Sequence, residues 1–539
     1  MQKLLSGTLF FPWKIAVILL WTVLISEPLA FPQGANSQFL RLIELAQQRY
    51  QAGDLEGAIA NYQQAIKLNP NSGVAYSGLG SALLDKGSFQ ESAEASETAV
   101  SLLEKPRTFP GTTQVLRGPD PLPLAITLNN LALAYYQLSR YDDALKTAER
   151  AVQTNSKLSN CWNTRGMVLE VKGKLDEAIF SYQTANTLSP KSASISHNLS
   201  EALQRKGKVD EALSVLQQAI SFHSDDADLQ TSLGHALFAK DRFADAVVAY
   251  QKSLAVRSDD PSTLYGLSLA LRSQGKYAEA LNAASRAHQF APTDSDITLG
   301  LASLDAEIGR YDDSAALTQG VANTSAGDPA YLLLQADFLL NQNRPKEALA
   351  PLNQALAARP DFPEATAALA SLQIDLGHIP NGLEIVKASL TSHPNSPDLH
   401  NAYGLILSSQ SHFSEAQAEF EKSLLLRPNF PDAMVNHAIV LSRQKHFPEA
   451  VSEFQNALAM NPKNLKAQAN LAGTLLSANR YEEAAAAFRA AVALAPNDPD
   501  LRGNLGLALQ GAGHPAEARQ ALAEAEKLRS AGKSPAAKP

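Results

Sequence analysis

The chain has 539 residues, 46 Lys and Arg against 54 Asp and Glu, a net charge of -8 and one cysteine. Its apolar content of 45% excludes disorder as the main state. A single cysteine excludes an intramolecular disulfide and a thiol redox pair, and the acidic balance does not support a nucleic-acid-binding body.

The N-terminus carries an apolar run at 15–25, which follows Lys3 and Lys14 and precedes Glu27. This order is typical of a secretory signal, and the run is too short to cross a hydrocarbon core of about 30 Å. We therefore expect residues 1–30 to be a cleaved signal peptide or an uncleaved membrane anchor, with a buried N-terminal helix as the third alternative. Either of the first two places the rest of the chain outside the cytoplasm, periplasmic, secreted or anchored.

A 34-residue period organises the chain after a linker expected at 31–38. It recurs without insertion over 125–532, and two further units lie within 39–106, which makes fourteen units. The eighth residue is small in every unit: Ala46, Gly80, Ala132, Gly166, Ser200, Gly234, Ser268, Ala302, Ala336, Ala370, Gly404, Ala438, Ala472 and Gly506. Small residues at fixed places let two helices approach closely.

The fifteenth residue of most units predicts a turn between two helices. It is glycine in eight units, at Gly53, Gly87, Gly173, Gly207, Gly275, Gly309, Gly377 and Gly513. Glycine suits the left-handed residue that ends a helix, and the prolines near the end of many units stop a second helix. Each unit is thus predicted to form a helix, a tight turn and a second helix.

The unit at 159–192 carries the clearest signature, with Trp162, Gly166, Leu169, Ala178, Tyr182, Ala185 and Pro190. In these residues the chain resembles the tetratricopeptide-repeat family. The resemblance implies an all-α fold, a right-handed α-solenoid superhelix of stacked helix-turn-helix repeats whose first helices line a concave groove. It also implies binding of peptides or proteins, with neither catalysis nor a cofactor.

Some segments depart from the pattern. Asp305 and Gln373 stand where a large apolar residue is expected, Gly382 replaces a packing alanine, and Val321 is the exception at the twenty-seventh place. We expect softer joints in the units that begin at residues 295 and 363.

Two further segments fall outside the repeats. The proline-rich segment 107–124 predicts an extended loop, either a tolerated insertion or a loop that folds over the groove or meets a partner. Residues 533–539 are expected to be a disordered basic tail. The last helix before this tail has one apolar face, formed by Ala518, Ala521, Leu522, Ala525 and Leu528, as the end of a solenoid requires.

No motif for a phosphate-binding loop, a serine nucleophile or a helical zinc site occurs, so we expect no enzyme activity. Cys161 is interpreted as a packed thiol. His378, His412 and His446 recur every 34 residues and His514 continues the series. Equivalent positions on stacked helices lie roughly 10 Å apart, which excludes a shared metal ion. These histidines are either solvated turn residues or a pH-sensitive edge.

Asparagines at the fifth and sixth places of the units are the candidate peptide-binding residues: Asn129, Asn130, Asn163, Asn198, Asn401, Asn436, Asn470 and Asn504. Carboxamides donate and accept hydrogen bonds, which suits the backbone of an extended peptide. The alternative is that they are only default residues of the repeat. We expect these amides to be exposed in the groove. No lysine occupies the fifth place, so capture of a C-terminal carboxylate is not expected.

The sequence thus predicts a non-catalytic scaffold, exported or membrane-tethered, that holds extended polypeptide segments in a concave groove. The alternative is an accessory subunit that positions an envelope enzyme or a secretion or assembly complex. The expected partners are proteins or peptides and not nucleic acid. Membrane contact is expected only through the N-terminal segment, if that segment is uncleaved.

Overall fold

The computed structural model describes residues 33–105 and 121–532. Within these ranges it contains helices and no strands. The chain divides into two compact units, Met1–Arg257 and Ser258–Pro539, which we call the N-terminal and the C-terminal unit and describe separately.

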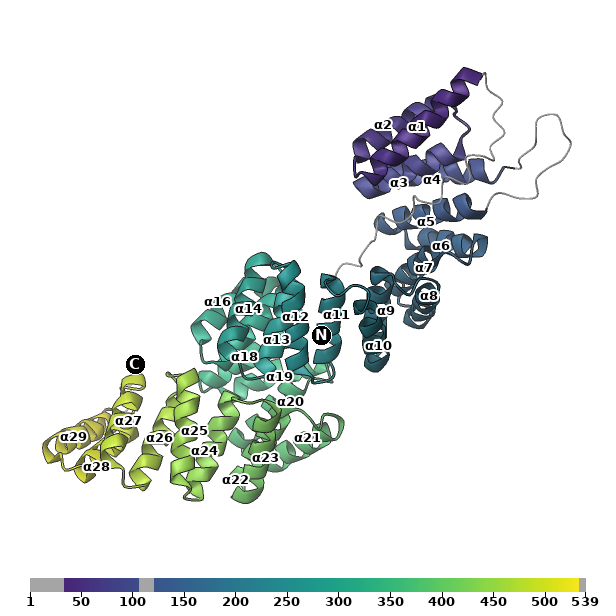
Figure 1. Cartoon of the computed structure of the whole chain (residues 1–539). Coiled ribbons are helices and arrows are strands. Elements are labelled where there is room, and N and C mark those ends of the chain that lie inside the picture. The colour runs from purple at the N-terminus through teal and green to yellow at the C-terminus, as the bar shows by residue number, and fades with distance from the viewer. Residues whose placement is uncertain (1–32, 106–120, 533–539) are drawn as a thin grey trace, which may run out of the picture. The chain divides into compact units, whose positions relative to one another are not determined.

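Helices of the N-terminal unit follow one another as pairs (Figure 1). They are α1 (Gln33–Gln51), α2 (Leu55–Leu68), α3 (Gly73–Lys86), α4 (Phe89–Leu103), α5 (Pro121–Gln137), α6 (Tyr141–Thr154), α7 (Ser159–Val171), α8 (Leu175–Leu188), α9 (Ala193–Arg205), α10 (Val209–Ile220), α11 (Ala227–Phe238) and α12 (Phe243–Val256).

Helices of the C-terminal unit continue the same pairing. They are α13 (Pro261–Ser273), α14 (Tyr277–Phe290), α15 (Ser295–Glu307), α16 (Tyr311–Gly320), α17 (Ala322–Ser325), α18 (Pro329–Asn341), α19 (Pro345–Ala358), α20 (Pro363–Asp375), α21 (Ile379–Ser392), α22 (Pro397–Ser409), α23 (Phe413–Leu426), α24 (Pro431–Arg443), α25 (Phe447–Met460), α26 (Leu465–Ser477), α27 (Tyr481–Leu494), α28 (Pro499–Gly511) and α29 (Pro515–Gly532).

The described residues thus form fourteen helix pairs, which confirms the all-α solenoid predicted from the sequence. Apart from the short α17, each helix packs against the next one in the chain within its unit. The first helices of neighbouring repeats also touch directly, as α5 does with α3 and α7. The second helices show no comparable contact with one another in the part of the chain that the structure describes. A stack curves toward its more closely packed side, so within each unit the first helices form the inner wall.

In some repeats the small residue at the eighth place receives an aromatic ring from the second helix. A Cβ on Gly166 would lie 2.6 Å from the ring of Tyr182, and one on Gly404 would lie 2.6 Å from the ring of Phe420. Both rings are fully buried. The small residue therefore makes room for a large apolar side chain, which fixes the distance between the paired helices.

The turn at the fifteenth place is left-handed in all fourteen repeats. Eight of these residues are the predicted glycines, and the other six are Ser139, Asp241, Asn343, Ser411, Lys445 and Asn479, with φ between 57° and 68°. This conformation costs non-glycine residues free energy, which the packing of the two helices offsets.

Two helices begin earlier than the sequence pattern indicates. Helix α1 begins at Gln33, within the linker expected at 31–38. Helix α5 begins at Pro121, so the end of the segment 107–124 is helical. Proline is well tolerated in the first turn of a helix, where its missing N–H has no intrahelical partner.

The remaining expectations for the chain ends and for the insertion fall on residues 1–32, 106–120 and 533–539, which lie outside the described residues. Among the helices that are described, none combines the length and the apolar character that a membrane span requires.

The repeat that begins at Ser295 departs most from the others, because its second helix is split. Helix α16 ends at Gly320, and the short α17 follows Val321. Asp305, the other irregular residue of this repeat, is 3% exposed and lies 3.3 Å from the guanidinium of Arg310. Burial raises the pKa of Asp305 to about 6.

The last helix, α29, has the expected buried face only in part. Ala518, Ala521 and Ala525 are buried, whereas Leu522 is 39% exposed. A Cβ on Gly506 would lie 2.6 Å from Cγ of Leu522, so this partly exposed leucine of α29 packs directly against the glycine of α28.

Candidate functional site

The candidate asparagines are less exposed than expected. Six of the eight are between 1% and 9% exposed: Asn129, Asn130, Asn163, Asn198, Asn401 and Asn436. Asn470 is half-buried, and Asn504 is exposed. The expectation of exposed amides is therefore wrong for these six, because their side chains are packed between first helices, as the bonds of Asn198 and Asn436 to the preceding repeat show.

The buried amides bond to one another across repeats. Asn198 Nδ2 donates to Asn163 Oδ1 at 3.1 Å in the N-terminal unit, and Asn436 Nδ2 donates to Asn401 Oδ1 at 3.0 Å in the C-terminal unit. Each bond joins the sixth place of one repeat to the fifth place of the repeat before it. The sequence pattern places these residues on one wall but does not show this pairing.

The other candidates have different partners. Asn130 Nδ2 donates to Ser81 Oγ at 2.8 Å, which joins α5 to α3. Lys466 Nζ donates to Asn436 Oδ1 at 2.9 Å, and Asn470 Nδ2 donates to the carbonyl oxygen of Lys466 within its own helix. The three C-terminal asparagines therefore have unlike environments.

Charged residues on the inner wall of the N-terminal unit accompany the amides. Arg205 Nη1 lies 2.8 Å from Glu170 Oε1, and the hydroxyl of Tyr182 donates to Glu170 Oε2 at 2.8 Å. Burial raises the pKa of Glu170, although the charge of Arg205 opposes this rise. The ion pair joins α7 to α9, so the amide pair and this ion pair bridge the same two repeats.

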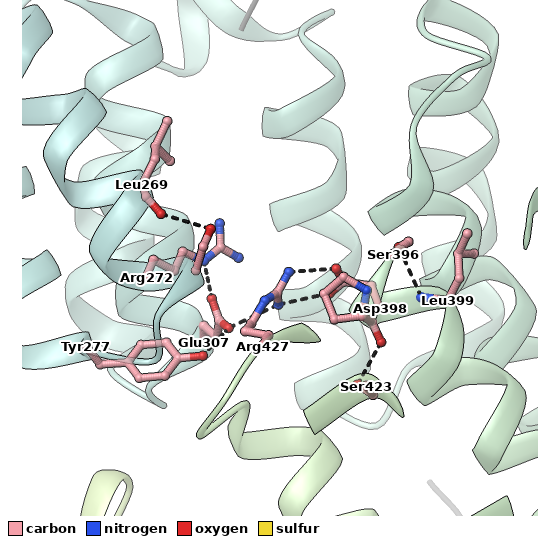
Figure 2. A network of polar contacts seen from close by, with 11 residues as sticks. Leu269, Arg272, Tyr277, Glu307, Ser396, Asp398, Leu399, Ser423 and Arg427 are labelled. Carbon is pink, nitrogen blue, oxygen red and sulfur yellow. Dashed lines mark hydrogen bonds and ion pairs between the residues drawn. The ribbon is translucent and has the colours of Figure 1, made fainter. Parts of the chain in front are cut away.

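The C-terminal unit carries a different arrangement, in which residues three repeats apart meet (Figure 2). Arg427, in the turn after α23, bonds to both carboxylate oxygens of Asp398 at 3.2 and 2.7 Å and lies 3.4 Å from Glu307. Glu307 also accepts from Arg272 Nε at 2.5 Å and from the Tyr277 hydroxyl at 2.7 Å. Figure 2 shows Arg427 between Glu307 and Asp398.

The backbone turns beside this network fit closely together. A Cβ on Gly275 would lie 1.9 Å from the carbonyl oxygen of Pro428, and one on Gly309 would lie 1.9 Å from Asn461 Nδ2. We call the ion pairs of Arg427 with Glu307 and Asp398, together with these two glycine contacts, the clasp. The clasp joins the turns of the seventh and eighth repeats to the loops that follow the eleventh and twelfth.

The electrostatics of the clasp follow from burial. Burial would raise the pKa of Glu307, but Arg272 and Arg427 together lower it below its ordinary value. For Asp337, on the inner wall of the same unit, burial raises the pKa to about 7, and the charges of Asp432, Asp398 and Glu307 add to this rise.

The histidine series and the cysteine have simple environments. His378, His412 and His446 precede second helices as their N-cap residues and are exposed, as is His514. In the described part of the chain, no group of three or more metal-ligand side chains is gathered. Cys161 is buried, and burial raises its pKa to about 12, so its thiol is not activated as a nucleophile.

The helix pairs, the left-handed turns and the inner wall of first helices together define a repeat solenoid, a fold consistent with a protein-binding role. One tetratricopeptide-repeat model matches residues 129–193, 231–296 and 435–499. A second tetratricopeptide-repeat model matches residues 172–236, 271–338, 339–406 and 475–529. A TPR repeat model matches residues 46–87. The chain belongs to the tetratricopeptide-repeat family.

Three known proteins show similarity to this chain in sequence or in structure. The chain is 31% identical over 158 residues to TPR repeat-containing protein MJ1428 of Methanocaldococcus jannaschii, a match over 25% of this chain and 28% of that protein's length. The APC/C hetero-tetramer Cut9-Hcn1 is similar at 14% identity over 92% of this chain and 94% of that chain, with a TM-score of 0.49. Pseudomonas aeruginosa pilF is similar at 18% identity over 40% of this chain and 97% of that chain, with a TM-score of 0.36.

Proposed function

We propose that the chain is a non-catalytic scaffold that holds extended polypeptide on the inner wall of the N-terminal unit. The observation that carries this proposal is the arrangement of polar contacts in the two units. In the N-terminal unit the hydrogen bond from Asn198 to Asn163 and the ion pair of Arg205 with Glu170 join neighbouring repeats. In the C-terminal unit the clasp joins distant repeats and occupies polar groups of that unit.

The amides of the N-terminal unit favour contact with a peptide backbone. Asn129 Oδ1 and Asn198 Oδ1 are buried and accept no hydrogen bond within the described residues. An acceptor left in this state costs free energy, which a peptide N–H that reaches it would offset. Backbone contacts of this kind do not depend on the client's side chains, which suits a scaffold for several clients.

Site-specific photocrosslinking in cells that produce the full chain tests this proposal. A photoreactive amino acid replaces Val171, the 43% exposed last residue of α7, and in a second variant replaces Phe180, the 59% exposed residue of the outer helix α8. Adducts with other polypeptides are expected from position 171 and not from position 180. Adducts from position 180 alone, or from neither position, contradict the proposal.

We further propose that the repeats work outside the cytoplasm, exported or tethered by the N-terminal segment. The order of Lys3, Lys14, the apolar run 15–25 and Glu27 supports this proposal. A reporter that is active only outside the cytoplasm, fused after residue 538, is expected to be active. A silent reporter, together with an active cytoplasmic reporter at the same site, contradicts export.

A further inference from the structure

A cavity of about 500 Å³ lies beside the clasp in the C-terminal unit. One side comes from the start of α14 and the turn before it, and the other from the loop after α23 and from α25. The lining includes Lys276, Tyr277, Glu279, Asn429, Asn456 and Met460. The volume is within the range of about 300–1,000 Å³ that is usual for small-molecule sites. Because residues of distant repeats form its two sides, the cavity depends on the contact that the clasp maintains.

Two opposite charges in this cavity lack the ion pair that other repeats make at the same places. Eight repeats have Lys or Arg as the sixteenth residue and Asp or Glu as the nineteenth. In seven of them the two side chains pair at 2.5–3.2 Å: Arg140–Asp143, Lys174–Glu177, Lys208–Glu211, Arg242–Asp245, Arg310–Asp313, Arg344–Glu347 and Arg480–Glu483. The eighth repeat of this kind has Lys276 and Glu279. Within the described residues, neither of these side chains forms an ion pair or a hydrogen bond.

Lys276 and Glu279 are arranged to meet a small zwitterion. Both residues are exposed, so a ligand that enters the cavity reaches both charges. They lie three residues apart at the start of α14, a spacing that makes side chains neighbours on a helix surface. A ligand whose ammonium and carboxylate groups share one carbon atom matches two partners this close. The two ends of a longer peptide lie too far apart to pair with both.

The rest of the lining suits an apolar side chain. Ala278 and Ala459 line the cavity, together with the half-buried Met460 near the end of α25. The unbranched thioether of methionine adapts to irregular apolar shapes. This lining favours a ligand with an aliphatic or aromatic group over one with a second charge.

We propose that this cavity binds a free α-amino acid with an apolar side chain, whose carboxylate pairs with Lys276 and whose ammonium pairs with Glu279. The site is separate from the inner wall of the N-terminal unit, so the inference does not rest on peptide binding there. A bound amino acid also contacts both sides of the cavity, and it therefore favours the closed clasp.

Calorimetric titration of the full chain with L-leucine, L-methionine and L-phenylalanine tests the proposal. Two analogues of leucine separate the two charges, because N-acetyl-L-leucine lacks the ammonium group and L-leucinamide lacks the carboxylate. Each analogue is expected to bind about tenfold more weakly than L-leucine, since each loses one charge-assisted contact.

Two substitutions assign the contacts to their residues. In Lys276→Gln the tenfold preference for L-leucine over L-leucinamide should fall to about one, while the preference over N-acetyl-L-leucine remains. Glu279→Gln should show the reverse. The controls are Lys208→Gln and Glu211→Gln, which make the same charge changes at the same places of the fifth repeat and should keep both preferences. Both cavity variants should melt like the unaltered chain, because neither breaks an ion pair.

The outcomes that overturn the proposal are distinct from one another. Absence of binding by all three amino acids at millimolar concentration overturns the site. Equal binding of leucine and its two analogues excludes recognition of the zwitterion. Preferences that persist in both cavity variants place the binding elsewhere on the chain. None of these results bears on peptide binding by the N-terminal unit.

Discussion

Arg427 and Glu307 lie 120 residues apart in the sequence, yet their side chains meet at 3.4 Å in the C-terminal unit. In most solenoids each repeat contacts only its neighbours, so stability is close to a sum of local terms. The clasp adds a contact between the eighth and eleventh repeats. The repeats between them are thus expected to unfold together rather than one by one.

Replacing Arg427 tests the strength of the clasp. Arg427→Gln leaves the buried carboxylates of Glu307 and Asp398 without their common cation, which is expected to cost about 3–5 kcal/mol. The measurement is urea denaturation, with amide hydrogen exchange of α13–α16 as a local probe.

Arg489→Gln is the matched control, because Arg489 pairs with Glu517 on the surface and both side chains are more than half exposed. An exposed pair contributes about 0–1 kcal/mol. Equal effects of the two substitutions on the urea midpoint would mean that the clasp does not stabilise the unit.

Gly275 has two roles, because it adopts the left-handed turn conformation and also lets the backbone of Pro428 approach closely. Substitution by asparagine separates these two roles. Asn343 and Asn479 occupy the same place with φ of 58° and 59°, so asparagine accepts this backbone conformation. Gly275→Asn, however, would place a Cβ 1.9 Å from the oxygen of Pro428, whereas nothing lies within 4 Å of a Cβ on Gly377.

We therefore expect Gly275→Asn to lower the free energy of unfolding by roughly 1–3 kcal/mol, a typical cost of overpacking. Gly377→Asn should change it much less. Denaturation curves of the two variants provide the comparison, and a Gly377 variant as unstable as the Gly275 variant would show that only the turn conformation matters.

Asp337 gives the C-terminal unit a pH-dependent stability. Its pKa in the folded chain is about 7, above the ordinary value of 3.8. Between these values the folded state holds a proton that the unfolded chain has released, so stability falls as the pH rises from about 4 to about 7. The negative charges of Asp432, Asp398 and Glu307 add to the rise in the pKa of Asp337. Once Asp337 is deprotonated, its own negative charge is therefore repelled by these three carboxylates.

Asp337→Asn should flatten this decline, because the amide has no proton to release. Urea midpoints at pH 5 and pH 7.5 measure the slope. Asp259→Asn, at an exposed position, is the control and should keep the slope of the unaltered chain. An Asp337 variant with an unaltered slope would place the pH dependence on other groups, such as Asp305, whose pKa burial raises to about 6.

The helix pairs were predictable because the signals that define them are local and repeat fourteen times. The split of α16 also has a sequence signal, since Gly320 has low helix propensity and Val321 breaks the pattern of small residues. The clasp has no such signal. It depends on a small rotation per repeat that accumulates over three to four repeats, and Gly275 looks like every other turn glycine until that rotation is known.

The candidate site was predictable in residue type but not in environment. The fifth and sixth places of a unit can be assigned to the first helix, which forms the inner wall. Whether an amide there faces the groove or the next repeat depends on the spacing of neighbouring helices. That spacing buries Asn436 and leaves Asn504, at the same place two repeats later, exposed.

This difference predicts unequal effects of removing the two amides. Asn436 bonds to Asn401 and Lys466, so Asn436→Ala leaves a buried acceptor unpaired and is expected to cost about 1–3 kcal/mol. Asn504→Ala should have little effect or a small stabilising one, since alanine has the better helix propensity. Thermal melts of the two single variants measure this directly, and equal melts would contradict the structural role of Asn436.

The double variant Asn163→Ala with Asn198→Ala addresses binding in the N-terminal unit. Each amide that contacts a peptide backbone contributes about 0.5–1.5 kcal/mol, so the double variant should lose roughly 1–3 kcal/mol of affinity for a peptide that the unaltered chain binds, about five- to more than a hundredfold. It removes both partners of the bond between the two amides, so the melt should fall less than when one partner is left unpaired. Asn198→Ala alone is the comparison for stability. Unchanged affinity of the double variant would mean that this amide pair only joins repeats, and peptide contact would then have to come from other residues of the wall.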